Sequence, residues 1–158
     1  LRLYIKKIGQ TKKESKNVKK LLKKEKEFGI TKKDTYRNFQ NQILEKKISI
    51  WKFFSVAKKE KKKIACYGAP AKGNTMLNYC QIGKDFINFT VDKNPAKQGK
   101  LLPGTHIPIF NLKKINEFKP DYLVILPWNL KEEIVEEMKY IRKWGGKFVV
   151  LTPKVKIF

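Results

Sequence analysis

The sequence is poor in the residues that build metal centres and disulfide frameworks. It contains two cysteines, Cys66 and Cys80, and a single histidine, His106, among 158 residues. Two cysteines are too few for a disulfide-stabilised scaffold, and without a cluster of cysteine and histidine we expect no metal site. No nucleophile is paired with a general base either, which leaves His106 as the one candidate for a catalytic residue.

Long apolar runs and arginine are also scarce. No stretch approaches the ~20 apolar residues of a membrane span, and no signal peptide is visible, so we expect a cytoplasmic protein without a membrane partner. Only three of the 37 basic residues are arginine, the residue whose forked guanidinium suits nucleic-acid sites. We therefore attribute the net charge of +23 to lysine on exposed faces and do not expect nucleic acid as the partner. A basic nucleic-acid adaptor using residues 6–63 is the alternative.

The chain has enough apolar residues for a core, since 41% are apolar and 12% aromatic. Its charge is uneven: residues 1–63 contain 22 basic and 6 acidic residues, and residues 64–158 contain 15 and 8. The chain opens with Leu1 inside a strand-like run, so we expect a fragment of a longer protein. The predicted division is an N-terminal strand with connecting helices over 1–62 and a second domain over 63–158.

The first part alternates like a strand over residues 1–5 and then becomes helical. Residues 11–28 predict a lysine-rich amphipathic helix that ends near Gly29. A second helix is predicted from about residue 31 into the lysine run at 58–63. Its apolar residues recur at steps of three, four or seven, which predicts one stripe packed into the core. The stripe consists of Tyr36, Phe39, Ile43, Ile50, Trp51 and Phe54.

From residue 64 onward, short apolar strands alternate with helices. The predicted strands are 64–67, 86–91, 107–110, 122–126, 148–151 and 155–158, and the predicted helices are 76–83, 112–118 and 130–141. Strands that are apolar throughout and linked by helices are typical of a parallel sheet covered on both faces. The sequence therefore predicts a Rossmann-like α/β fold with flanking helices, preceded by an N-terminal helical segment.

Parallel α/β sheets bind ligands beyond the carboxyl ends of their strands, which directs attention to the loop 68–75. Its Gly68 and Gly73 match the outer glycines of G-x-G-x-x-G, but Pro70 stands in the middle. The loop also misses the P-loop pattern, because Lys72 precedes Gly73 and Asn74 follows it. A lysine at the start of a helix still favours an anion. The alternative is a plain turn between strand and helix.

Three further positions are candidates for ligand binding, each with a plain alternative. Asp92 closes a strand, where a carboxylate can accept a ribose hydroxyl or simply form a turn before Asn94. His106 lies in a loop, where it could bind phosphate or be an ordinary exposed histidine. Trp128 and Asn129 follow an apolar strand and suit a stacked ring and its polar edge, or a core tryptophan and a helix cap.

Several longer motifs resemble one protein family. They are YGAPAKGNT at 67–75, LNYC at 77–80, VDKNP at 91–95, KQG at 97–99, LPGTHIP at 102–108, PDY at 120–122, LPWN at 126–129 and WGG at 144–146. Together they resemble the C-terminal domain of sugar C-methyltransferases, the S-adenosylmethionine-dependent enzymes that methylate a carbon of nucleotide-linked keto-deoxysugars. The resemblance extends over almost the whole chain.

The resemblance implies a three-part enzyme. An N-terminal zinc-binding module and a central S-adenosylmethionine domain would precede this domain, and both are partners that this sequence lacks. In such an enzyme a base removes a proton beside the sugar ketone, and the enolate carbon attacks the sulfonium methyl group. This chain lacks the glycine-rich methyl-donor motif and the Glu-His pair of the central domain. We therefore expect no cofactor in this chain and no turnover by it alone.

The predicted function is nucleotide-sugar binding, with a thymidine-diphosphate sugar as the expected ligand. The residues predicted to bind it are Gly68, Lys72, Gly73, Asn74, Thr75, Asp92, His106, Trp128 and Asn129. In this prediction Lys72 and the adjacent helix N-terminus anchor the diphosphate. The alternative is a Rossmann-like nucleotide-binding or regulatory module without methyltransferase activity, because fold does not fix function.

Overall fold

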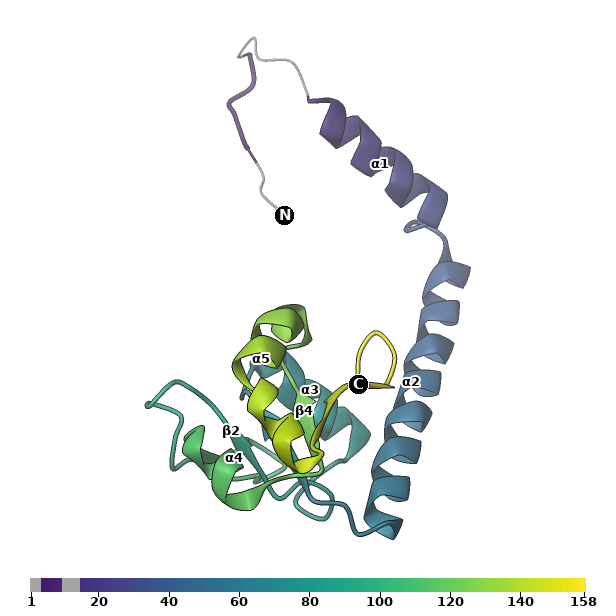
Figure 1. Cartoon of the computed structure of the whole chain (residues 1–158). Helices are drawn as coiled ribbons and strands as arrows, with labels where there is room; N and C mark the ends of the chain where they lie inside the picture. The colour runs from purple at the N-terminus through teal and green to yellow at the C-terminus, as the bar shows by residue number, and fades with distance from the viewer. Residues whose placement is uncertain (1–3, 10–14) are drawn as a thin grey trace. The chain divides into compact units, whose positions relative to one another are not determined.

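The computed structural model describes residues 4–9 and 15–158, in two compact units, Leu1–Ile43 and Leu44–Phe158. The first unit contains α1 (Lys16–Phe28) and the beginning of α2 (Lys33–Lys59), which Figure 1 shows in purple and blue. Of the strand predicted at 1–5, residues 1–3 lie outside the described residues, and Tyr4 and Ile5 are not in a strand. The predicted strand is therefore not formed at Tyr4 and Ile5.

The helix α1 ends where the sequence predicted. Gly29 adopts the left-handed conformation with φ of 76°, and its N–H donates to the carbonyl groups of Glu25 and Lys26. This is the usual way for glycine to close a helix. No residue of α1 is buried, and its apolar side chains Val18, Leu21, Leu22 and Phe28 are all exposed.

The helix α2 is buried over its C-terminal half only. Ile50 and Phe54 lie in the core, as predicted, whereas Tyr36 and Phe39 are 59% and 55% exposed. The predicted core stripe is thus confirmed for one half of the helix and wrong for the other. The reason is that the sheet and its loops pack against Ile50 and the residues that follow, and the earlier part of the stripe belongs to the other unit.

The second unit is built on a six-stranded sheet in the order β3-β2-β1-β4-β5-β6. The first five strands are parallel and β6 pairs antiparallel with β5. The strands are β1 (Ile64–Tyr67), β2 (Phe89–Val91), β3 (Ile109–Phe110), β4 (Tyr122–Ile125), β5 (Lys147–Val150) and β6 (Lys156–Ile157). This order is that of the Rossmann fold, so the predicted fold class is confirmed.

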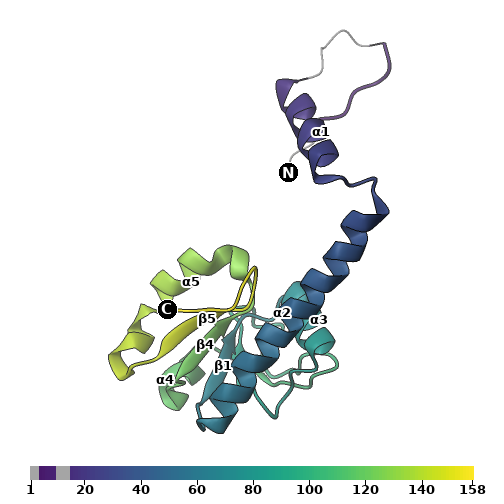
Figure 2. The same ribbon diagram turned by 90° about the vertical axis from the view of Figure 1, so that its right-hand side faces the viewer.

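Helices cover both faces of the sheet, which explains why the strands are apolar throughout. One face packs against the C-terminal half of α2 and against α3 (Ala71–Cys80), through Phe54 and Leu77. The other packs against α4 (Lys113–Phe118), α5 (Lys131–Glu137) and the 3₁₀ helix η2 (Lys139–Trp144). Figure 2 shows the C-terminal end of α2 beside β1.

Several local boundaries differ from the predicted ones. The helix predicted at 76–83 begins already at Ala71, after Pro70 at its N-cap, and ends at Cys80. The helix predicted at 130–141 is divided into η1 (Trp128–Leu130), α5 and η2. The strand predicted at 86–91 is shortened to β2. Among residues 4–9 and 15–158, no helix is long and apolar enough to cross a membrane.

Candidate functional site

The carboxyl edge of the sheet brings three of the predicted binding segments together. Gly68 follows β1, Asp92 follows β2, and Pro127 comes two residues after β4. The strand β1 lies between β2 and β4, and the chain moves from β1 to β2 and β3 before it crosses back to β4. Such a reversal is the topological switch point at which parallel α/β sheets bind ligands. We call Gly68, Lys72, Asp92, Trp128 and Asn129 the carboxyl-edge cluster.

The two glycines of the loop let its backbone approach the segment after β4. Gly68 has φ of 88°, and a Cβ atom there would lie 2.7 Å from Cδ of Pro127. A Cβ atom at Gly73 would lie 2.8 Å from Cβ of Leu126. Any other residue at either position would push α3 away from the end of β4. The glycines therefore hold α3 close to the segment that carries Trp128.

Lys72 links the first turn of α3 to the segment after β4. Its ammonium donates a hydrogen bond to Oδ1 of Asn129 and lies 4.5 Å from the centre of the Trp128 ring. Both partners are neutral, and the ammonium is not in an ion pair with any described carboxylate. An anion at this edge would thus meet an uncompensated positive charge.

The N-terminus of α3 has no side-chain cap. Pro70 occupies the N-cap position and offers no side-chain hydrogen bond, and the first helical bond runs from the N–H of Asn74 to the carbonyl of Pro70. The N–H groups of residues 71–73 therefore have no partner within the helix. Together with the helix dipole they favour an anion beside Lys72.

The Asp92 carboxylate accepts hydrogen bonds from other groups of the protein on both oxygens. Its Oδ2 accepts hydrogen bonds from the N–H of Ala69 at 2.8 Å and from Nζ of Lys97 at 3.1 Å, and its Oδ1 accepts one from the N–H of Asn94 at 2.9 Å. Burial by itself would raise the pKa of this carboxyl group, but the two N–H groups and Lys97 outweigh it and leave the pKa below 3.8. Asp92 is therefore a charged structural group of this loop.

Asn74 and Thr75 are engaged within α3. The Thr75 hydroxyl donates to the carbonyl of Ala71 at 3.0 Å, one turn earlier. The carbonyl and side-chain oxygens of Asn74 both accept hydrogen bonds from the Asn78 amide, at 2.9 and 3.3 Å. These contacts show the two side chains stabilising the helix, and their predicted binding role stays a prediction.

His106 lies away from the carboxyl-edge cluster. It is exposed and has a positive φ of 54°, in the loop 92–108 that joins β2 to β3. This part of the loop packs beside the end of α3: Asn78 donates to the carbonyl of Pro103 at 3.0 Å, and the carbonyl of Thr105 lies near Gly83. The structure thus does not bring His106 to Lys72 or Asp92.

A second polar cluster at this edge was missed by the sequence analysis. The Tyr67 hydroxyl donates to Oε2 of Glu137 at 2.7 Å, and Lys93 pairs with Oε1 of the same carboxylate at 2.9 Å. Burial and the Glu137 carboxylate both raise the pKa of Tyr67. The position of Tyr67, a polar tip at the end of an apolar strand, is the signal that could have identified it. Glu137 gives no such signal, because its partners are distant in sequence.

The described residues offer no visible metal centre. In residues 4–9 and 15–158 no group of three His, Cys, Asp or Glu side chains is placed to hold a metal ion. Cys66 and Cys80 are buried free thiols, and burial raises the pKa of both. Buried thiols with a raised pKa are poor nucleophiles and poor ligands.

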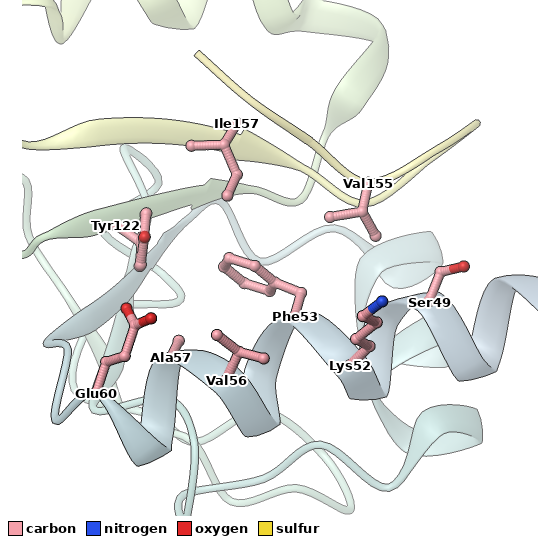
Figure 3. A pocket seen from close by; sticks show the side chains of 9 residues that line it. All are labelled: Ser49, Lys52, Phe53, Val56, Ala57, Glu60, Tyr122, Val155 and Ile157. Atoms are coloured by element: carbon pink, nitrogen blue, oxygen red, sulfur yellow. The ribbon is translucent and has the colours of Figure 1, made fainter.

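An apolar pocket of about 400 Å³ lies elsewhere, between α2 and the strand β6. Figure 3 shows Phe53 of α2 facing Ile157 and Val155, with Tyr122 of β4 beside them. None of the residues predicted to bind ligand lines this pocket. It is therefore separate from the carboxyl-edge cluster.

Comparisons with known proteins agree with the motifs. A family model described as the C-methyltransferase C-terminal domain matches residues 1–153. The C-methyltransferase NovU of Streptomyces niveus is 34% identical over 140 residues, which are 89% of this chain and 33% of that protein. The chain therefore spans about a third of the length of this curated relative.

One solved structure that resembles the fold is UDP-D-quinovosamine 4-dehydrogenase from Vibrio fischeri. It has a TM-score of 0.41 and 18% sequence identity, over 56% of this chain and 76% of that one. The family model matches nearly all of the chain, including the whole carboxyl-edge cluster. This chain belongs to the C-methyltransferase C-terminal domain family.

Proposed function

We propose that the second unit is the nucleotide-sugar-binding domain of an S-adenosylmethionine-dependent sugar C-methyltransferase. Membership of the family supports the enzyme class, and the carboxyl-edge cluster supports the binding role. The observation that carries the proposal is Lys72, an ammonium with neutral partners beside the open N-terminus of α3 at the switch point. A diphosphate would supply the missing negative charge.

The rest of the ligand would extend from the diphosphate along the segment after β4. Trp128 presents an indole ring beside Lys72, and Asn129 presents an amide that can both donate and accept. A ring stacked on Trp128 and hydrogen-bonded by Asn129 suits the base of a nucleotide. The domain would thus hold one end of the substrate while the sugar projects toward the methyl donor, which is a positioning role.

The described residues do not suit S-adenosylmethionine. A nucleoside cofactor in a Rossmann fold usually places its ribose on the carboxylate that follows the second strand. Here that carboxylate is Asp92, which already holds Ala69, Asn94 and Lys97. We therefore place the methyl donor outside this chain, and the chain's own residues bind and orient the sugar nucleotide.

Calorimetric titration with thymidine diphosphate and a thymidine-diphosphate keto-sugar tests this proposal. We expect saturable binding in the millimolar range or tighter, weakened about tenfold or more in Lys72→Ala because a charge-assisted contact is lost. The matched control is Lys114→Ala, which removes a lysine whose Nζ pairs with Glu117 at 2.8 Å on the surface of α4.

Two results would contradict the proposal. A folded wild-type chain that binds neither ligand would remove the binding role and favour a regulatory module that has lost its ligand. Equal losses in Lys72→Ala and Lys114→Ala would show that binding follows the net charge and not the carboxyl-edge cluster.

A further inference from the structure

All four backbone hydrogen-bonding groups of Gly68 and Ala69 are satisfied by other parts of the protein. The N–H of Gly68 donates to the carbonyl of Val91 at 2.6 Å, and its carbonyl accepts the buried Thr90 hydroxyl at 2.7 Å. The N–H of Ala69 donates to Oδ2 of Asp92 at 2.8 Å, and its carbonyl accepts Nζ of Lys97 at 3.1 Å. The turn that leads into α3 is therefore fixed from β2 and the loop after it.

Asp92 and Lys97 hold the Ala69 part of this turn, through its N–H and its carbonyl group. Lys97 reaches the carbonyl of Ala69 and the Asp92 carboxylate at once, each at 3.1 Å. Asp92 is 13% exposed and Lys97 is 41% exposed, so the acid lies beneath and the lysine covers it. Lys97, Asp92 and the Ala69 peptide thus form a closed triangle of charge-assisted hydrogen bonds.

This arrangement leaves the turn without free donors. The N–H groups of Gly68 and Ala69 are both used, and Pro70 has none. Donors open to a ligand begin at Ala71, in the first turn of α3. The direction of these donors depends on the turn before them, and hence on Asp92 and Lys97.

We propose that Asp92 and Lys97 are positioning residues, which fix the Gly68–Ala69 turn and so aim the first turn of α3 at the phosphate. This inference rests on the proposed function, because it concerns the same phosphate site. It differs from the prediction that Asp92 accepts a ribose hydroxyl. With Oδ2 holding two donors and Oδ1 a third, the carboxylate acts through Ala69 and not on the ligand.

The positioning role and the ribose-binding role of Asp92 predict different effects of its substitution on the binding of a ligand without ribose. The experiment titrates inorganic pyrophosphate, uridine diphosphate and 2′-deoxyuridine diphosphate into the 158-residue chain. The variants are Asp92→Asn and Lys97→Met, with Lys97→Arg as the conservative variant and Lys114→Met as the control. Thermal unfolding of each variant establishes that it is folded, and amide hydrogen exchange at Ala69 reports on the turn itself.

A positioning role predicts the same loss for all three ligands. We expect about tenfold weaker binding in Asp92→Asn and in Lys97→Met, and faster exchange at the Ala69 amide in both. Lys97→Arg should recover most of the affinity, since it restores a cation that can donate to both oxygens. Lys114→Met should bind all three ligands as the wild type does.

Two contrary results would overturn the positioning role, and a third would overturn the phosphate site on which it rests. A loss confined to the two nucleoside diphosphates, with pyrophosphate unaffected, would assign Asp92 to the ribose and overturn the positioning role. Unchanged exchange at Ala69 in folded Asp92→Asn would also overturn it, because the turn would then hold without the carboxylate. If the wild type binds none of the three ligands, the proposed phosphate site fails, whereas the Ala69 exchange still decides whether Asp92 and Lys97 fix the turn.

Discussion

Gly68 is required by two separate constraints, its positive φ and its contact with Pro127. We predict that Gly68→Ala lowers the free energy of unfolding by about 2–4 kcal/mol, from backbone strain and from the close approach to the proline. Gly99 is the matched control, because it has a similar φ of 76° and nothing within 4 Å of a Cβ atom.

Gly99→Ala should therefore lose only the strain energy, about 1 kcal/mol. Chemical denaturation of both variants separates the two contributions. Equal losses at the two positions would show that the approach of Gly68 to Pro127 has no energetic consequence.

Asp92 should make stability depend on pH in the acid range. Its folded pKa is lowered, so its contribution is fully present above the ordinary value of 3.8 and is lost as the pH falls through the lower folded value. We predict that the wild type loses more stability than Asp92→Asn between neutral pH and the acid range. Denaturation curves at pH 7 and at several values below 4 measure the difference; parallel curves would show that the carboxylate is not stabilised by its partners.

At the scale of the element, α2 combines two different environments in one helix. Phe54 is 0% exposed and contacts Phe53 and Phe86, with ring centres 5.0 and 5.9 Å away, whereas Phe39 is 55% exposed. We predict that Phe54→Ala lowers the free energy of unfolding by about 3–5 kcal/mol, because it leaves a cavity in the core.

Phe39→Ala is the control within the same helix, and we expect a change within about 0.5 kcal/mol. Urea denaturation measures both. A large loss in Phe39→Ala would mean that this ring is covered in solution by a partner or by a part of the protein outside the described contacts.

The helix α3 shows how a local element serves the site. Its buried face, Gly73, Leu77 and Cys80, packs toward the sheet, which leaves Lys72 directed at the segment after β4. A helix started five residues later, as the apolar repeat alone suggested, would have left Lys72 in a loop. The early start thus places both the lysine and the open N–H groups at the carboxyl edge.

At the scale of the whole molecule, the structure suggests where the chain can be shortened. We predict that residues 44–158 fold alone with a Tm within ~3 °C of the full chain, because they contain both core clusters. A chain of residues 63–158 should lose cooperative unfolding. It lacks the core residues of α2, and without them one face of the sheet is uncovered; they are Ile50, Phe53, Phe54 and Ala57.

Calorimetry of the two shortened chains measures this difference. A cooperative transition in residues 63–158 near that of the full chain would show that α2 is not part of the folding unit. It would also support the boundary after residue 62 that the sequence suggested.

The sequence by itself determined the fold class. Strands that are apolar throughout, such as 64–67 and 122–126, and that are separated by helices are typical of a parallel sheet covered on both faces. The glycine after the strand at 64–67, the lysine four residues later and the Trp-Asn pair after the strand at 122–126 were also recognisable, because strand ends and turn residues have local signals. Two of the family motifs, YGAPAKGNT at 67–75 and LPWN at 126–129, lie in these same segments.

Only the tertiary structure decided which of these residues meet. Residues distant in sequence come together through the strand order, so Lys72 contacts Asn129 and Asp92 holds Ala69, while His106 lies beside the end of α3. The contacts of Lys97 and Glu137 could not be predicted from the sequence, although Lys97 lies in a family motif, because their partners are brought to them by the sheet. Hydrophobic periodicity specifies which side of an element is buried, but contact between loops depends on how whole elements pack.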